Sequence, residues 1–183
     1  NNKNFKRNTI FKKLNVTPLK KTTIKFLNWF AEYNIIPKGM ALKLVLLSSN
    51  AVEISQKDAF NIFKTKIATN TIKLSDEQQK SLRKMNISNE QFRVHVLQGT
   101  TGSGKTIVYF SALKEIIKKG FQGLILLPEI GLTSQFEKKF LEFFGIVPAI
   151  WHSGISKKKK EIIWSGVANG EIKVVIGARS SLF

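Results

Sequence analysis

Residues 99–106 read Gly-Thr-Thr-Gly-Ser-Gly-Lys-Thr and match the phosphate-binding pattern G-x-x-x-x-G-K-T in full. In such a loop, glycines let successive backbone N–H groups point inward around the phosphates of a nucleotide. The lysine supplies a positive charge to the β and γ phosphates, and the threonine hydroxyl can ligate Mg²⁺. The residues of this predicted site are Gly99, Thr100, Thr101, Gly102, Ser103, Gly104, Lys105 and Thr106.

The sequence on either side of the loop favours the same interpretation. Residues 92–97 alternate apolar and polar side chains and predict a strand, and residues 105–119 carry apolar side chains at helical spacing. The order strand, glycine loop, helix places the phosphates at the positive N-terminus of a helix. The alternative is a glycine-rich turn followed by Lys-Thr by chance. It would require the strand pattern, the glycine loop and the helix pattern to occur in this order by coincidence.

The composition indicates one α/β domain with a smaller appendage and a strongly basic surface. Hydrophobic residues make up 43% of the 183 residues, including 14 Phe, which suffices for a sizeable core. Lys and Arg number 30 against 12 Asp and Glu, a formal net charge of +18. This charge favours a polyanionic partner such as nucleic acid. For any single lysine, a surface-solvating role in a lysine-rich composition remains an equal alternative.

Cysteine and histidine usage excludes several site classes. The absence of Cys excludes disulfides and thiolate metal sites, and two His are too few for a histidine metal centre. His95 alternates with apolar residues and is predicted to pack in its strand. No apolar run approaches the ~20 residues needed to span a bilayer, and residues 1–4 lack the character of a signal peptide. We therefore expect a cytoplasmic chain without a membrane partner, whose first residue is internal to a longer protein.

Residue composition and hydrophobic spacing divide the sequence into four segments. Residues 1–17 form a basic arm, residues 18–47 a helical hairpin, and residues 48–73 a linker with one helical turn near residues 59–63. From residue 74 onward, strands alternate with helices, which predicts a parallel sheet with helices on both faces. The strands are expected at residues 123–127 (buried on both faces), 147–151 and 172–177, and the helices at residues 78–85, 105–119, 133–144 and 156–167.

Leu74-Ser75-Asp76-Glu77-Gln78-Gln79, some twenty residues before the glycine loop, resembles the adenine-reading glutamine motif of superfamily 2 helicases. A glutamine amide donates and accepts hydrogen bonds at once, which suits adenine. We predict that Gln78 contacts the base, with Gln79 as the alternative.

Three later segments sharpen the resemblance: residues 127–135, 151–154 and 176–183. With the glycine loop, they closely resemble the first helicase lobe of the primosomal replication-restart DNA helicase family (primosomal protein N′). This resemblance covers residues 74–183 and implies a RecA-like P-loop domain. A weaker resemblance places residues 16–47 in the helical region that follows that family's amino-terminal DNA-binding domain, as a remnant of its winged-helix region.

The resemblance implies two DNA-backbone contacts, each just after the carboxyl end of a predicted parallel strand. Hydroxyls, helix N-terminal N–H groups and an arginine fork in these segments suit phosphate. The first contact comprises Pro128, Glu129, Gly131, Leu132 and Thr133, and the second comprises Gly177, Arg179 and Ser180. As alternatives, Arg179 is a surface arginine, His152 shapes a loop, and Lys157–Lys160 form a solvated helix face that adds to the positive field.

The sequence lacks part of what hydrolysis needs. A carboxylate at a strand end must hold Mg²⁺, another must orient water, and an arginine finger must meet developing charge. Asp58 and Asp76 are the only aspartates, and neither follows an apolar strand. In the family, the acidic pair lies in a D-E-x-H motif beyond residue 183, and the family's zinc-binding cysteine module has no counterpart here.

Three hypotheses follow. The first is a truncated fragment of an ATP-dependent 3′-5′ DNA helicase of replication restart, using ATP and Mg²⁺. Its partners would be forked or single-stranded DNA and restart proteins, in the bacterial nucleoid. The second is a binding module from a split or decayed gene, which holds nucleotide and nucleic acid without turnover. The third is another P-loop ATPase such as a small-molecule kinase, which the +18 charge disfavours.

Overall fold

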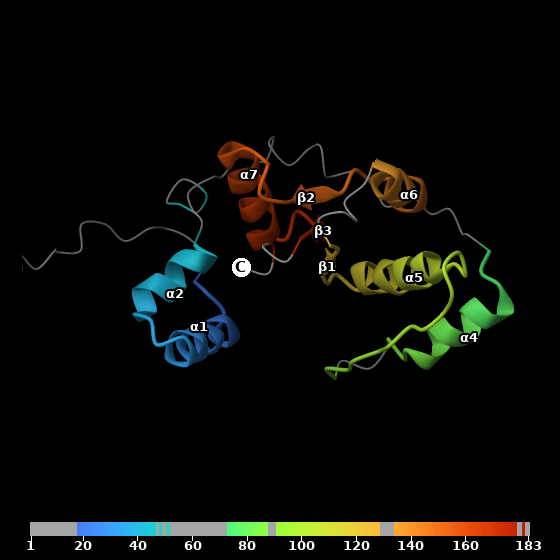
Figure 1. Cartoon of the computed structure of the whole chain (residues 1–183), viewed down its shortest axis with the longest axis horizontal. Helices are drawn as coiled ribbons and strands as arrows, with labels where there is room; N and C mark the ends of the chain where they lie inside the picture. The colour runs from blue at the N-terminus through green and yellow to red at the C-terminus, as the bar shows by residue number, and fades with distance from the viewer. Residues whose placement is uncertain are drawn as a thin grey trace, which may run out of the picture. The chain divides into compact units, whose positions relative to one another are not determined.

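The computed structural model describes residues 18–46, 48, 51, 73–87, 91–128, 134–178 and 181. The chain divides into two compact units, residues 1–55 and 56–183. This division falls inside the segment that was predicted to be a linker. The first unit holds α1 and α2, and the second holds the elements from α4 to β3 (Figure 1).

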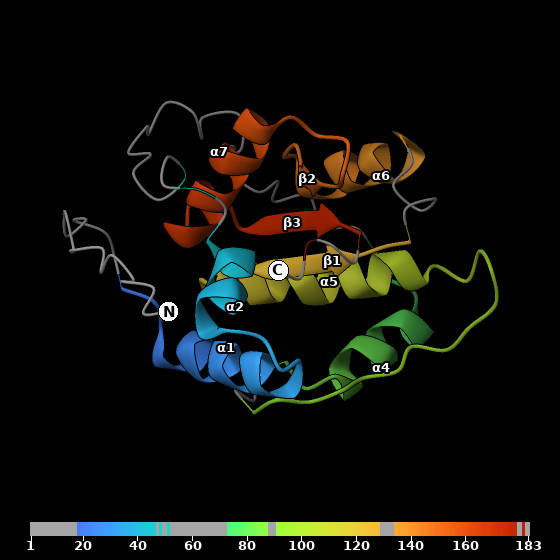
Figure 2. The same ribbon diagram turned by 60° about the vertical axis from the view of Figure 1, so that its left-hand side comes forward.

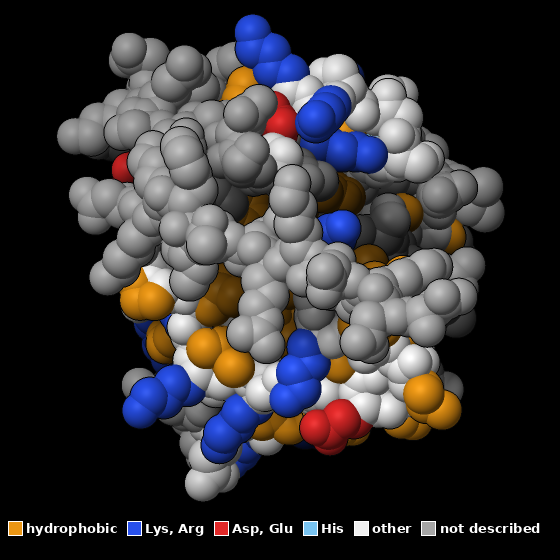
Figure 3. Space-filling model, turned by 90° about the vertical axis from the view of Figure 1, so that its left-hand side faces the viewer, with side chains coloured by type: hydrophobic (Ala, Val, Ile, Leu, Met, Phe, Trp, Pro, Cys, Tyr) orange, Lys and Arg blue, Asp and Glu red, His pale blue; other side chains and the backbone are white. Residues whose placement is uncertain are grey.

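The first unit is a pair of helices, α1 (Lys21–Tyr33) and α2 (Lys38–Val45), where the sequence predicted a helical hairpin. The α1 helix ends at Asn34, whose side-chain amide donates a hydrogen bond of 2.9 Å to the Phe30 carbonyl. Its buried core is small and consists of Leu27, Ala31 and Ala41. Hydrophobic side chains also reach the surface, and Figure 3 shows them beside Lys and Arg side chains on one face of the molecule.

The second unit is an α/β structure built on a three-stranded parallel sheet. Its strands are β1 (Gly123–Leu126), β2 (Ala149–Trp151) and β3 (Val174–Gly177), in the order β1-β3-β2. Its helices are α4 (Asp76–Lys84), α5 (Lys105–Lys118), α6 (Ser134–Phe144) and α7 (Lys157–Ala168). The predicted fold class is confirmed, and each of these strands lies within the predicted range.

A cluster of aromatic rings joins α5, α6 and β3. Phe110 of α5 contacts Phe140, Phe143 and Phe144 of α6 at ring-centroid distances of 5.6, 5.3 and 5.2 Å, and all four rings are buried. Ile176 of β3 belongs to the same cluster. In both ribbon views, α5 and α7 lie on opposite sides of β3 (Figures 1 and 2). The connections β1-α6-β2 and β2-α7-β3 cross the sheet in opposite directions, so right-handed crossovers place α6 and α7 on opposite faces. Helices therefore cover both faces of the sheet.

The strand predicted at residues 92–97 is wrong. These residues have no regular secondary structure and do not pair with the sheet, and Phe92 and Val96 are 93% and 90% exposed. His95, predicted to pack, is exposed as well. The physical reason is pairing, because residues 92–97 bond to neither of the two open sheet edges, the outer sides of β1 and β2. An alternating pattern sets the faces of a strand but does not supply the neighbour that its backbone needs.

The prediction that the strand at residues 123–127 is buried on both faces is also wrong. Leu124 and Leu126 are exposed, whereas Ile125 between them packs against the aromatic cluster. The described helices pack on the face of β1 that carries Ile125, and the opposite face carries the exposed Leu124 and Leu126. A continuous apolar run is therefore compatible with one-sided burial.

We expect Phe110→Ala to lower the free energy of unfolding by about 3–5 kcal/mol, because it leaves a cavity among the α6 rings. Urea denaturation followed by circular dichroism measures this loss. Leu141→Ala is the matched control, since Leu141 is an exposed residue on α6 and should cost less than about 1 kcal/mol. Equal losses in the two variants would show that the ring cluster does not hold the unit together.

Candidate nucleotide and nucleic-acid site

The glycine loop at residues 99–104 leads directly into α5. The Gly104 residue caps the helix in the left-handed region, with φ of +79°. Its carbonyl accepts hydrogen bonds from the Ile107 and Val108 N–H groups at 3.0 and 3.4 Å. The first N–H groups of any helix have no partner within the helix and carry its positive end. The loop therefore leads into a helix N-terminus, in the order of loop and helix that the sequence predicted.

Lys105 spans the loop that precedes it. Its Nζ donates hydrogen bonds to the carbonyl oxygens of Gly99 at 2.7 Å and Thr100 at 2.6 Å. A lysine ammonium has three N–H donors, so these two bonds leave one for a further acceptor. The backbone thus holds the ammonium at the loop, where it can meet an anion.

Gln78 lies against the same loop through the start of α4. The Ser75 Oγ accepts a hydrogen bond from the Gln78 N–H at 3.3 Å, and the Gln78 Oε1 accepts one from the Ser75 N–H at 3.0 Å. This reciprocal capping box fixes the Gln78 amide. Its Nε2 is so close to Gly104 that a Cβ at position 104 would overlap it. The structure thus places Gln78 beside the glycine loop.

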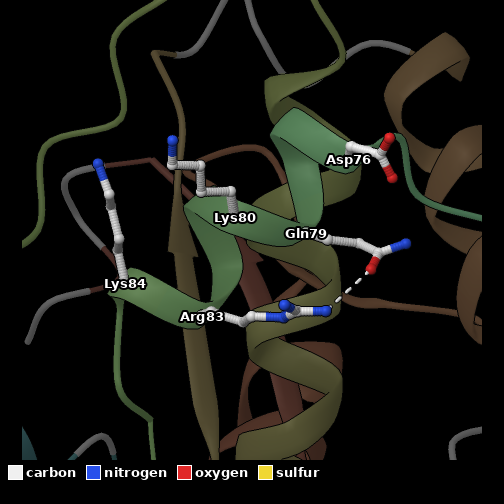
Figure 4. A pocket seen from close by; sticks show the side chains of 5 residues that line it. All are labelled: Asp76, Gln79, Lys80, Arg83 and Lys84. Carbon is white, nitrogen blue, oxygen red and sulfur yellow. Dashed lines mark hydrogen bonds between the residues drawn. The ribbon is translucent and has the colours of Figure 1, made fainter.

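Gln79, the alternative, is directed elsewhere. Its Nε2 donates to the Leu74 carbonyl at 3.2 Å, and its Oε1 accepts from Arg83 at 3.3 Å. It lines a groove of about 550 Å³ with Asp76, Lys80, Arg83 and Lys84 (Figure 4). None of the glycine-loop residues lines that groove. Of the two glutamines, Gln78 is therefore the one positioned next to the phosphate loop.

A cleft of about 710 Å³ opens between the glycine loop and α6. Sequence reasoning missed its two charged lining residues on α6, Lys139 and Glu142, which carry no motif and reach the cleft only because α6 packs on α5. The other lining residues are Thr101, Gly102, Gly104, Lys105, Thr106, Ile107, Phe110 and Phe143. The cleft combines an anion-binding end with an apolar wall, a combination typical of small-molecule sites.

Two side chains of α5, Tyr109 and Lys114, have shifted pKa values. Burial raises the pKa of the Tyr109 hydroxyl, and a side-chain hydrogen bond with Thr106 partly opposes that rise. The predicted Mg²⁺ ligand Thr106 therefore already has a side-chain partner one turn away. Burial also lowers the pKa of Lys114, with the charge of Lys118 adding to the effect, and the Lys114 ammonium lies 5.6 Å from the centre of the Phe143 ring.

The carboxyl ends of the strands meet at one edge of the sheet. Gly177 pairs in register with Leu126 on one side and with Trp151 on the other, and its carbonyl accepts from the Leu127 N–H at 2.9 Å. A Cβ at Gly177 would lie 2.7 Å from the Trp151 carbonyl oxygen, which explains a glycine here. Pro128 follows Leu127 directly, so the first residues of both predicted DNA-contact segments start from neighbouring strands.

The remaining predicted DNA-contact residues lie outside the described part of the chain: Glu129, Gly131, Leu132, Thr133, Arg179 and Ser180. His152 is described, and its Nδ1 accepts a hydrogen bond from the Gly154 N–H at 3.1 Å, which confirms the loop-shaping interpretation. Within the described ranges, no group of three or more His, Cys, Asp or Glu side chains could hold a metal ion, and no helix there is long and apolar enough to cross a membrane.

Gly104 and Gly102 offer a matched pair of substitutions. Both have left-handed backbones, so Ala at either position should cost about 1–2 kcal/mol of the free energy of unfolding. Gly104→Ala should lose about 1 kcal/mol more, because its Cβ displaces the Gln78 amide from its hydrogen bond with Ser75, whereas Gly102 has open space. Urea denaturation of the two variants measures the difference. Equal losses would mean that Gln78 does not abut the loop in solution.

Comparisons with known proteins identify the family of this chain. The profile of the family described as "Type III restriction enzyme, res subunit" matches residues 71–183, more than half of the chain. Replication restart protein PriA of Rickettsia felis is 37% identical over 160 residues, which cover 87% of this chain and 24% of the relative. PriA of Bacillus subtilis is 35% identical over 117 residues, covering 63% of this chain and 14% of the relative.

PriA of Haemophilus influenzae is 36% identical over 116 residues, covering 63% of this chain and 16% of the relative. The chain spans about a quarter of the length of the Rickettsia relatives. The chain therefore belongs to the family of the type III restriction enzyme res subunit, a RecA-like helicase domain, and within that family it is similar to replication restart protein PriA.

Proposed function

We propose that this chain is the ATP-binding part of the first lobe of an ATP-dependent 3′-5′ DNA helicase acting in replication restart. The observation that carries the proposal is the contact between the Gln78 amide and Gly104, in a loop whose Lys105 is held for an anion. In this proposal, a side chain that reads the nucleobase would stand beside a loop that holds the phosphates. The relatives' printed function supports the biological role.

The residues around the loop fit the triphosphate of ATP. The α5 N-terminus and the loop N–H groups would surround the phosphates, and the remaining Lys105 donor would reach the β and γ oxygens. Mg²⁺, when bound, neutralises phosphate charge, and Thr106 would hold it through its hydroxyl. Lys139 on the opposite wall of the cleft would add a second positive charge.

Gln78 supplies a reason to prefer adenine. Its Nε2 faces the loop and can donate to a ring nitrogen of the base. Its Oε1 already accepts from Ser75, but a carbonyl oxygen has two lone pairs and can also accept from an exocyclic amino group. The capping box would hold both groups in place before the nucleotide arrives, which lowers the ordering cost of binding.

We propose binding without measurable hydrolysis for these 183 residues. Of the two aspartates, Asp76 lies in the first turn of α4 and serves its N-terminus, and Asp58 lies outside the described residues. Glu142 lines the cleft but belongs to α6 rather than to the end of a strand. This arrangement keeps open the second candidate, a module that holds nucleotide and nucleic acid without turnover.

The sheet edge at Pro128 and Gly177 is the proposed contact with the DNA backbone. Ligands of open parallel sheets bind beyond the carboxyl ends of the strands, and both residues are there. The net charge of +18 would attract a phosphate backbone over a long range. The proposed partner is forked or single-stranded DNA, together with restart proteins in the complete helicase.

We expect wild-type chain to bind Mg²⁺-ATP weakly and Lys105→Ala to weaken that binding about tenfold, because a charge-assisted hydrogen bond to phosphate is worth about 1.5–3 kcal/mol. Isothermal titration calorimetry measures both constants. Lys118→Ala, at the far end of α5, is the matched charge control and should bind as the wild type does. DNA-stimulated phosphate release that disappears in Lys105→Ala would contradict the proposal of binding without turnover.

Binding of single-stranded DNA should weaken steeply with salt, because phosphate contacts release condensed counterions. About four contacts would lower the association constant about fiftyfold between about 50 and 200 mM salt. Fluorescence anisotropy of a labelled oligonucleotide at several salt concentrations gives the slope. A flat response would contradict the proposed backbone contact.

A further inference from the structure

The α1 helix carries a ladder of three aromatic rings, Phe26, Trp29 and Tyr33, along one side. Phe26 and Trp29 have a ring-centroid distance of 5.9 Å, and Trp29 and Tyr33 have one of 5.3 Å with planes only 23° apart. The spacing of three and four residues places the rings in a row on the helix surface. Trp29 and Tyr33 are therefore stacked on each other rather than scattered.

The ladder is open to solvent. Phe26, Trp29 and Tyr33 are 42%, 54% and 74% exposed, whereas Leu27 and Ala31 of the same helix are buried against α2. The core of this unit thus uses a different face of α1, and exposure grows along the ladder toward Tyr33. Contiguous exposed aromatic surface of this kind marks an interaction site more often than chance exposure does.

The charge around the ladder is basic. Lys21, Lys25 and Trp29 follow one another at intervals of four residues, so the two ammonium groups form a row that runs to the middle ring. The described residues of this unit include five lysines and a single acidic residue, Glu32, which lies one turn after Trp29.

We propose that this aromatic ladder is a stacking site for the unpaired bases of single-stranded nucleic acid, with Lys21 and Lys25 contacting the backbone. Exposed rings beside a basic row are the combination that binds single strands without sequence preference. Duplex DNA hides the faces of its bases, and an apolar protein partner gains nothing from the lysines. This inference goes beyond the proposed function and rests on it only for the class of partner, which is nucleic acid.

The test uses the full chain and two oligonucleotides of equal charge, an oligothymidylate of about twelve nucleotides and an abasic strand of the same length. Wild-type chain should bind oligothymidylate about tenfold more tightly than the abasic strand, because stacking a single base on an aromatic ring gives a gain of about this size. Trp29→Ala and Tyr33→Ala should remove most of this ratio while leaving affinity for the abasic strand unchanged. Tyr33→Phe keeps the ring and should keep the ratio.

Two controls separate base stacking from general apolar contact and from self-association. Met40→Ala removes an exposed apolar side chain of α2 outside the ladder and should bind both strands as the wild type does. Equal affinity of the wild type for the two strands would overturn the stacking site alone, whereas failure to bind either strand would overturn the proposed DNA contact as well. Concentration-dependent self-association lost in Trp29→Ala, with the base ratio retained, would show that the ladder contacts a second copy and would also overturn the proposal.

Discussion

The packing of Phe110 into the α6 rings is the interaction on which the nucleotide site depends. Phe110 lies five residues after Lys105 on the same helix, so any shift of its ring moves the N-terminus of α5. Its partners on α6 are three buried phenylalanines, and Ile176 connects the cluster to the central strand. A rigid, close-packed core transmits such a displacement rather than absorbing it. The position of the phosphate loop is thus set by hydrophobic packing that touches no nucleotide.

A second constraint is that position 104 must be occupied by glycine. The residue must adopt a left-handed backbone to start α5, and it must also leave room for the Gln78 amide. The capping box at Ser75 prevents that amide from turning away. One glycine therefore satisfies the conformation of the loop and its contact with α4, so a change in either helix would reach the phosphate site.

Local patterns predicted much of this architecture, and tertiary pairing decided the rest. The helix at Lys105–Lys118 and the strands up to Gly177 follow from spacing and composition alone. The segment at residues 92–97 does not, because a strand requires a neighbour, and this segment pairs with neither open edge of the sheet, β1 or β2. The sequence around Lys139 contains no motif that predicts a site. Lys139 lines the cleft only because α6 packs on α5. The choice between Gln78 and Gln79 likewise needed the geometry of the capping box.

A charge of +18 raises the question of how such a chain would discriminate among polyanions. Attraction to phosphate is shared by every nucleic acid and fades as salt rises, because it comes from counterion release. Stacking depends on the exposed face of a base and is less sensitive to salt, so it can distinguish an open strand from a duplex. The sheet edge and the ladder on α1 would thus contribute different terms, one setting affinity and the other recognising unpaired bases. Salt would therefore weaken the phosphate contacts, including those of Lys21 and Lys25, more than it weakens base stacking on the ladder.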